Sequence, residues 1–62
     1  MTDMERAILM TLLNMIEQNI ITVSNLNLLA RREQCLHISD ELNKVSARFA
    51  GMKSNIERLL DG

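Results

Sequence analysis

Apolar side chains recur every three or four positions along the second half of the chain, from Cys35 to Leu60. This spacing puts them on one stripe of an α-helix, because about 3.6 residues complete a helical turn. Read as the a and d positions of a heptad, the stripe is apolar throughout, which is typical of a helix that packs against other helices. The a and d residues are Cys35, Ile38, Leu42, Val45, Phe49, Met52, Ile56 and Leu59. We therefore expect one continuous helix over about residues 33–60.

Charged side chains flank this stripe. Glu41 and Arg48 occupy g positions, and Lys53 occupies an e position. Charges at e and g positions influence the orientation and choice of partner helices.

The first half of the chain predicts a second helix, over about residues 3–24. Thr2 and Glu5 have the spacing of a capping box, and Asp3 adds negative charge at the positive end of the helix dipole. The main apolar stripe consists of Leu9, Leu13, Ile16, Ile20 and Val23, and a second stripe beside it consists of Ile8, Leu12 and Met15. A surface helix usually has a single apolar stripe about 100° wide. This helix is apolar over a wider arc, so we expect it to be covered on two sides.

The main stripe of the first helix does not continue in register into the stripe of the second helix. Extending the main stripe of the first helix forward reaches Asn27 and Ala30, whereas extending the stripe of the second helix backward reaches Arg31 and Ser24. We predict a turn within about residues 24–33, where Ser24, Asn25 and Asn27 favour caps and turns. No Gly or Pro forces a turn there, so a single long helix with a shift in register is the alternative.

A chain of 62 residues forms one domain and buries little surface by itself. Its single cysteine rules out an internal disulfide, and Cys35 with His37 supplies two of the roughly four ligands of a zinc site. We expect no metal and no cofactor, so stability must come from packing between helices. The predicted fold is all-α: residues 1–62 form an antiparallel helical hairpin that completes a four-helix bundle or a coiled-coil assembly by oligomerisation. The predicted oligomer interface comprises the a and d residues of the second helix and the main stripe of the first.

Charge and composition bear on location and partners. The net charge of −1 implies no general attraction to nucleic acid or anionic lipid. The lone thiol indicates a reducing compartment, and the MTDMER start lacks a basic leader. No apolar run approaches the roughly 20 residues that span a bilayer. We expect a cytoplasmic protein with no membrane partner.

Few residues suggest chemistry. Cys35 lies on the apolar stripe and reads as a small buried hydrophobe rather than a nucleophile. His37 reads as a solvated helix residue. Asp40 and Glu41 are adjacent and point about 100° apart on a helix, so they do not form a carboxylate pair.

Residues 35–49, CLHISDELNKVSARF, resemble the small stage-zero sporulation phosphatases, which act on phospho-aspartate response regulators. That family forms helical hairpins with a Ser-Gln-Glu-Leu-Asp signature in the second helix, and Ser39, Glu41 and Leu42 match it. Asp40 stands where the family has Gln, and Asn43 where it has Asp. The resemblance implies an outward-facing partner surface, while the two departures favour binding over catalysis and leave phosphatase activity open. The candidate partner-binding residues are Ser39, Asp40, Glu41, Asn43 and Lys44.

Two other resemblances concern architecture. The LNLLARREQ stretch is similar to the end of the first helix and the turn of the plasmid copy-number regulator Rop, a dimeric four-helix bundle that binds RNA. Only Arg6 is basic before the predicted turn, so RNA binding is not expected to carry over. KVSARFAGMKSNIERLL is similar to short coiled-coil subunits of the DASH kinetochore ring.

These features together predict a small helical module for protein–protein interaction or regulation, with a response-regulator-like protein as one candidate partner. It would bind itself or other helical proteins. The alternatives are a structural coiled-coil subunit of a larger assembly and an RNA-binding homodimer.

Overall fold

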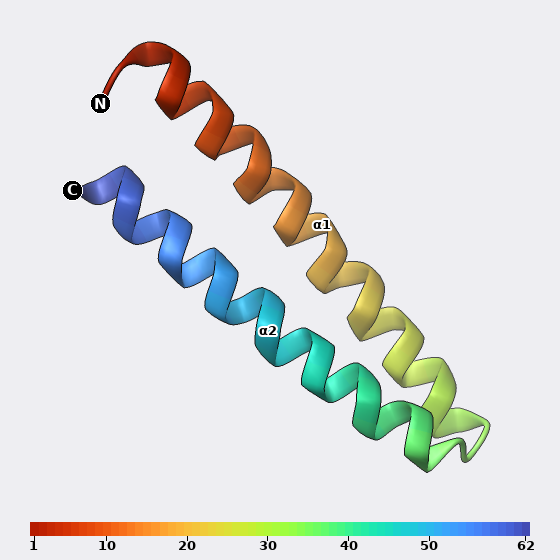
Figure 1. The fold of residues 1–62 in the computed structure, drawn as a ribbon. Helices are drawn as coiled ribbons and strands as arrows, with labels where there is room; N and C mark the ends of the chain where they lie inside the picture. Colours follow the sequence, from red (N-terminus) through yellow and green to blue (C-terminus); the bar gives the residue numbers. More distant parts are fainter.

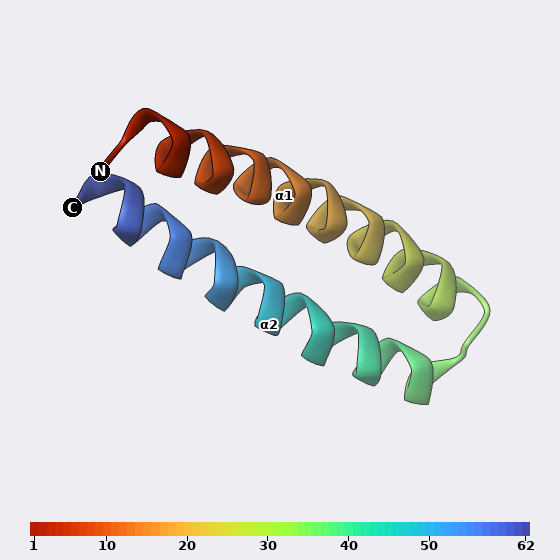
Figure 2. The same cartoon turned by 45° about the horizontal axis from the view of Figure 1, so that its top comes forward.

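The protein is an antiparallel pair of helices. The structure, a computed structural model, describes residues 1–62 and contains α1 (Asp3–Arg32) and α2 (Leu36–Asp61) with no strand. Figures 1 and 2 show the helices side by side along their whole length, with both termini at the same end. The molecule measures 47 × 14 × 11 Å. The predicted all-α helical hairpin is confirmed, and the single long helix is not formed.

The start of α1 is the predicted capping box. The Glu5 N–H donates to the Thr2 hydroxyl over 3.1 Å, and the Thr2 N–H donates to the Glu5 carboxylate over 3.1 Å. These two bonds satisfy backbone donors that have no partner inside the helix. The Thr2 amide, with a further contribution from its hydroxyl, holds the pKa of Glu5 below its usual value.

The turn lies later than the sequence predicted. Helix α1 ends at Arg32 rather than near residue 24, and the turn occupies Glu33–Cys35, so that α2 begins at Leu36 rather than near 33. The polar residues at 24, 25 and 27 remain helical because Asn27 and Ala30 continue the main stripe of α1 and pack against α2. Tertiary packing here outweighs a weak local preference for turns.

The reversal itself is a Schellman motif. The Cys35 N–H donates to the Ala30 carbonyl over 2.8 Å, and the Gln34 N–H donates to the Arg31 carbonyl over 3.1 Å. Gln34 has φ = 61°, the left-handed conformation that such a motif requires and that glycine usually supplies. The chain therefore turns without Gly or Pro.

The interface between the helices uses the main stripe of α1 as predicted, but α2 is rotated. Helix α2 faces α1 with its a residues and with the residue that follows each d position. These α2 residues are Cys35, Ser39, Leu42, Ser46, Phe49, Lys53, Ile56 and Leu60. The d residues Ile38, Met52 and Leu59 are each about half exposed. The predicted a and d stripe is therefore divided between the hairpin interface and the outer surface.

One property of α1 corrects the sequence analysis. By length and composition this helix is apolar enough to cross a membrane, with mean hydropathy 1.3 over an 18-residue window, although it has no uninterrupted apolar run of that length. Core helices of water-soluble proteins also reach this value, so hydropathy does not establish where the protein resides.

Candidate protein-binding face

Large apolar side chains from both helices lie uncovered on one side of the hairpin, which we call the open face. On α1 they continue the second stripe, and on α2 they are the d residues. The open face comprises Ile8, Leu12, Met15, Leu26 and Leu29 of α1 with Ile38, Val45, Met52 and Leu59 of α2. Eight of the nine are 37–58% exposed, and Val45 is half-buried. Each of these residues directly precedes a residue that faces the other helix. Because the two helices are antiparallel, a step of one residue toward the N-terminus turns the side chains of both helices to the same side of the hairpin.

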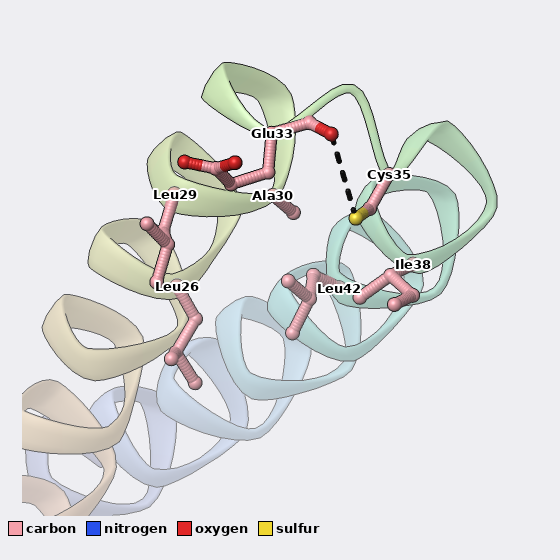
Figure 3. Close-up of a pocket in the computed structure, with 7 residues that line it drawn as sticks. All are labelled: Leu26, Leu29, Ala30, Glu33, Cys35, Ile38 and Leu42. Atoms are coloured by element: carbon pink, nitrogen blue, oxygen red, sulfur yellow. Dashed lines mark hydrogen bonds between the residues drawn. The ribbon is translucent and has the colours of Figure 1, made fainter.

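The open face is hollowed at the turn end. Figure 3 shows Leu26 and Leu29 on α1 opposite Ile38 and Leu42 on α2, with Cys35 at the junction. The remaining lining residues are Ala30 and Glu33, and the hollow has a volume of about 330 Å³. Six of its seven lining residues are hydrophobic. A hollow of this kind suits an apolar side chain from another helix.

A polar segment interrupts the α1 part of the open face at its middle. Asn19 is half-buried there, and the Thr22 hydroxyl donates to the Gln18 carbonyl over 3.0 Å. Because the Thr22 hydroxyl is satisfied within its own helix, it presents mainly its methyl group to a partner. Asn19 keeps an amide that is free to make a hydrogen bond across the face.

Three polar residues join the helices near the turn. The Ser39 hydroxyl donates to the Asn27 side-chain oxygen over 2.5 Å, and the Asn27 amide donates to the Asn43 oxygen over 2.7 Å. Ser39 is only 5% exposed. This cluster fixes the level at which the two helices meet, as buried amides do in coiled coils.

The position of Ser39 corrects the partner surface that the signature resemblance implied. Ser39 faces α1 and is bound to Asn27, so it does not project outward. Asp40, Glu41 and Lys44 are exposed, and Glu41 forms an ion pair with Lys44 at 3.0 Å. The five candidate residues therefore do not form one outward-facing surface.

The opposite side of the hairpin is more polar than the open face. Lys53 lies 3.9 Å from Glu17 across the two helices, next to Ile20 and Ile21. Exposed apolar side chains are fewer there than on the open face, and they are Met10, Ile21, Leu28 and Leu36. Scattered exposed apolar residues are ordinary on protein surfaces.

Residues considered for chemistry remain dispersed. The Cys35 thiol is free and half-buried, with Sγ 3.7 Å from the Glu33 carbonyl oxygen. His37 is exposed, as are Arg31 and Arg32. No three His, Cys, Asp or Glu side chains come together in an arrangement that could hold a metal ion.

Most of the residues predicted to form an oligomer interface pack between the two helices of the hairpin itself, where they are buried or half-buried. The residues that pack within the chain are Leu9, Leu13, Ile16, Ile20, Val23, Cys35, Leu42, Phe49 and Ile56. Only the d residues Ile38, Val45, Met52 and Leu59 belong to the open face. Sequence reasoning missed Leu26 and Leu29 because it placed the turn there. Extending the stripe of Ile8, Leu12 and Met15 by the same three- and four-residue steps would have reached both.

Comparisons with protein-family models, with curated proteins and with solved structures found no match to this chain.

Proposed function

We propose that the protein is a helical protein–protein interaction module whose open face binds other helices. The observation that supports this most is the gathering of nine apolar side chains from both helices, eight of them exposed, on one side of the hairpin. Contiguous apolar patches of this kind mark interaction sites on soluble proteins. Their spacing of three and four residues on each helix matches the packing of side chains between helices in a bundle.

The exposed area of the chain supports a partner of substantial size. A compact monomer of 7.1 kDa exposes about 4100 Å². This hairpin exposes 4848 Å², which is larger by roughly 750 Å². Each partner in a standard protein interface buries about 800 Å². Covering the open face would therefore bring the chain to the exposure expected of a compact protein.

The same observations weigh against the other functions considered. A phosphatase of the sporulation type needs its signature side chains directed at a receiver domain, whereas Ser39 is buried against α1. An RNA-binding surface needs several Lys or Arg side chains to contact phosphates, and Arg48 is the one basic residue beside the open face.

The proposal is tested by photo-crosslinking in native cells. A benzophenone amino acid replaces Met52 on the open face or, as a control, Lys44, whose side chain is 63% exposed on the outer side of α2. We expect covalent protein adducts from position 52 and few from position 44. Equal yields at both positions, or adducts with lipid in place of protein at position 52, would contradict the proposal.

A further inference from the structure

We propose that the partner on the open face is a second copy of this chain, placed so that both turns lie at the same end of a four-helix bundle. The inference rests on the proposed function and deepens it by naming the occupant and its orientation.

Contacts within the hairpin establish which residues lie at the same level. Asn27 is bound to Ser39 and Asn43, and Glu17 lies beside Lys53. Counting along each helix from these contacts puts most apolar residues of the open face level with another apolar residue, while Leu26 is level with Glu41 and Leu12 with Asn55. Leu29 is level with Ile38, and Met15 is level with Met52. Ile8 is level with Leu59 by the same count, and Thr22 is level with Val45.

If a two-fold axis parallel to the helices relates the two copies, residues at the same level lie opposite each other across the interface between copies. This axis places α1 of one copy over α2 of the other, at the level that α1 and α2 already share within one chain. Leu29 then meets Ile38 of the second copy, and Met15 meets Met52 of the second copy. Symmetry repeats each contact, so the open face is complementary to itself. All neighbouring helices in this bundle are antiparallel.

The polar residues of the face also fit this arrangement. Asn19 is level with Arg48, which is exposed at the rim of the open face. In the proposed dimer the Arg48 guanidinium therefore lies beside Asn19 of the second copy, whose amide oxygen is an available acceptor. The polar interruption of α1 thus meets the one cation at the rim.

The other two-fold arrangement, with turns at opposite ends, is disfavoured by charge. In that arrangement the two-fold axis is perpendicular to the helices and passes through their middle, so that α2 of one copy packs against α2 of the other. Because Arg48 lies near the middle of α2, the two copies would bring their Arg48 guanidinium groups together, which is repulsive. Because Asn19 is level with Arg48, the same axis would bring the two Asn19 side chains together and leave each Arg48 without the Asn19 oxygen as an acceptor.

Disulfide trapping tests both the occupant and its orientation. In a Cys35→Ala background, one chain carries Leu29→Cys and a differently tagged chain carries Ile38→Cys, so that any bond between them joins two copies. The control chain carries Leu28→Cys, which is adjacent in sequence and 61% exposed but lies on the other side of α1. We expect the 29–38 pair to cross-link at least tenfold faster than the 28–38 pair under mild oxidation. Equal rates, or no cross-link, would overturn the proposed orientation.

Solution mass separates failure of this inference from failure of the proposed function. The purified protein should have twice the chain mass of 7.1 kDa by light scattering. Met52→Glu should weaken dimerisation at least tenfold, whereas Ile21→Glu on the opposite side should change it less than threefold, with helicity retained in both. A monomeric wild-type protein that still forms adducts with a different protein at position 52 would refute the second copy and leave the proposed function standing. A monomer that yields no protein adducts, or that floats with phosphatidylglycerol vesicles, would refute both.

Discussion

At the residue scale, the hairpin depends on a few polar contacts with defined partners. Ser39 and Asn43 bind Asn27 across the helices, and Thr2 binds Glu5 at the start of α1. In the first set Ser39 is buried in the helix interface, where an unpaired polar atom is destabilising. The second is exposed and acts on the helix end alone. The two sets therefore respond to different perturbations.

Replacing Ser39 with Ala should lower the free energy of unfolding by about 1 kcal/mol, because it removes the donor to the Asn27 oxygen in a half-buried position. Urea denaturation measures the change. Asn43→Ala is the matched control: it removes the other bond of Asn27 at an exposed position and should have a smaller effect. A Ser39→Ala protein as stable as wild type would show that the cluster does not stabilise the hairpin.

The capping box should make the stability of the protein depend on pH in the acidic range. The Thr2 amide, and secondarily its hydroxyl, lowers the pKa of Glu5 in the folded state. A carboxyl with a depressed folded-state pKa contributes stability above its unfolded pKa of about 4.3, and that contribution is lost as the pH falls through the folded value. The Glu5→Gln variant should therefore lose less stability than the wild-type protein when the pH is lowered.

Titration of Glu5 by NMR provides the direct measurement for this prediction. The pKa of Glu5 should lie below the ordinary value in the wild-type protein and should rise in Thr2→Val, which lacks the hydroxyl. A Glu5 carboxyl that titrates at or above its ordinary pKa would contradict the capping-box account.

At the element scale, the turn and the rotation of α2 determine which surfaces are buried. The Schellman motif at Glu33–Cys35 requires a left-handed residue, and Gln34 occupies that position. The rotation of α2 brings Ser39 to Asn27, which needs a hydrogen-bond partner inside the interface. The same rotation turns Ile38 and Met52 toward the open face.

Gln34→Gly should stabilise the hairpin by about 1 kcal/mol, because glycine adopts the left-handed conformation without the steric penalty of a side chain. Gln34→Val provides the opposite control, since a β-branched side chain is strained there and should destabilise the turn. Thermal unfolding followed by circular dichroism compares the three proteins. A glycine variant less stable than wild type would indicate that the Gln34 side chain contributes contacts of its own.

At the scale of the whole molecule, the hairpin is long and has a small core. Only five of its 62 residues are buried, and Ile16 is the one large side chain that is fully enclosed. Domains of this size are marginally stable without a further source of burial. Association through the open face would supply that burial.

The melting temperature should therefore rise with protein concentration, because association stabilises the folded state by mass action. Melting curves over roughly a hundredfold range of concentration should differ by several degrees for the wild-type protein. Ile21→Glu should retain this dependence and Met52→Glu should lose it. A wild-type melting temperature independent of concentration would be evidence for a self-sufficient monomer.

Much of the fold follows from local pattern. The spacing of apolar residues predicted two amphipathic helices, because each helix repeats its faces every three or four residues. The Thr2 and Glu5 pair predicted the start of α1, since a capping box depends only on neighbours in the chain. The stripe from Leu9 to Val23 was identified as an interface, although the sequence analysis assigned it to an oligomer and the hairpin uses it internally.

Two features were decided only when the helices packed together. Ser24, Asn25 and Asn27 suit a turn or a helix equally well, so the position of the turn depended on Asn27 and Ala30 finding partners on α2. The apolar spacing also leaves open which of two overlapping stripes of α2 packs against α1. One stripe consists of the a and d residues, and the other consists of the a residues with the residue that follows each d position. Pairing Asn27 with Ser39 selected the latter stripe for the hairpin and left Ile38, Val45, Met52 and Leu59 on the open face.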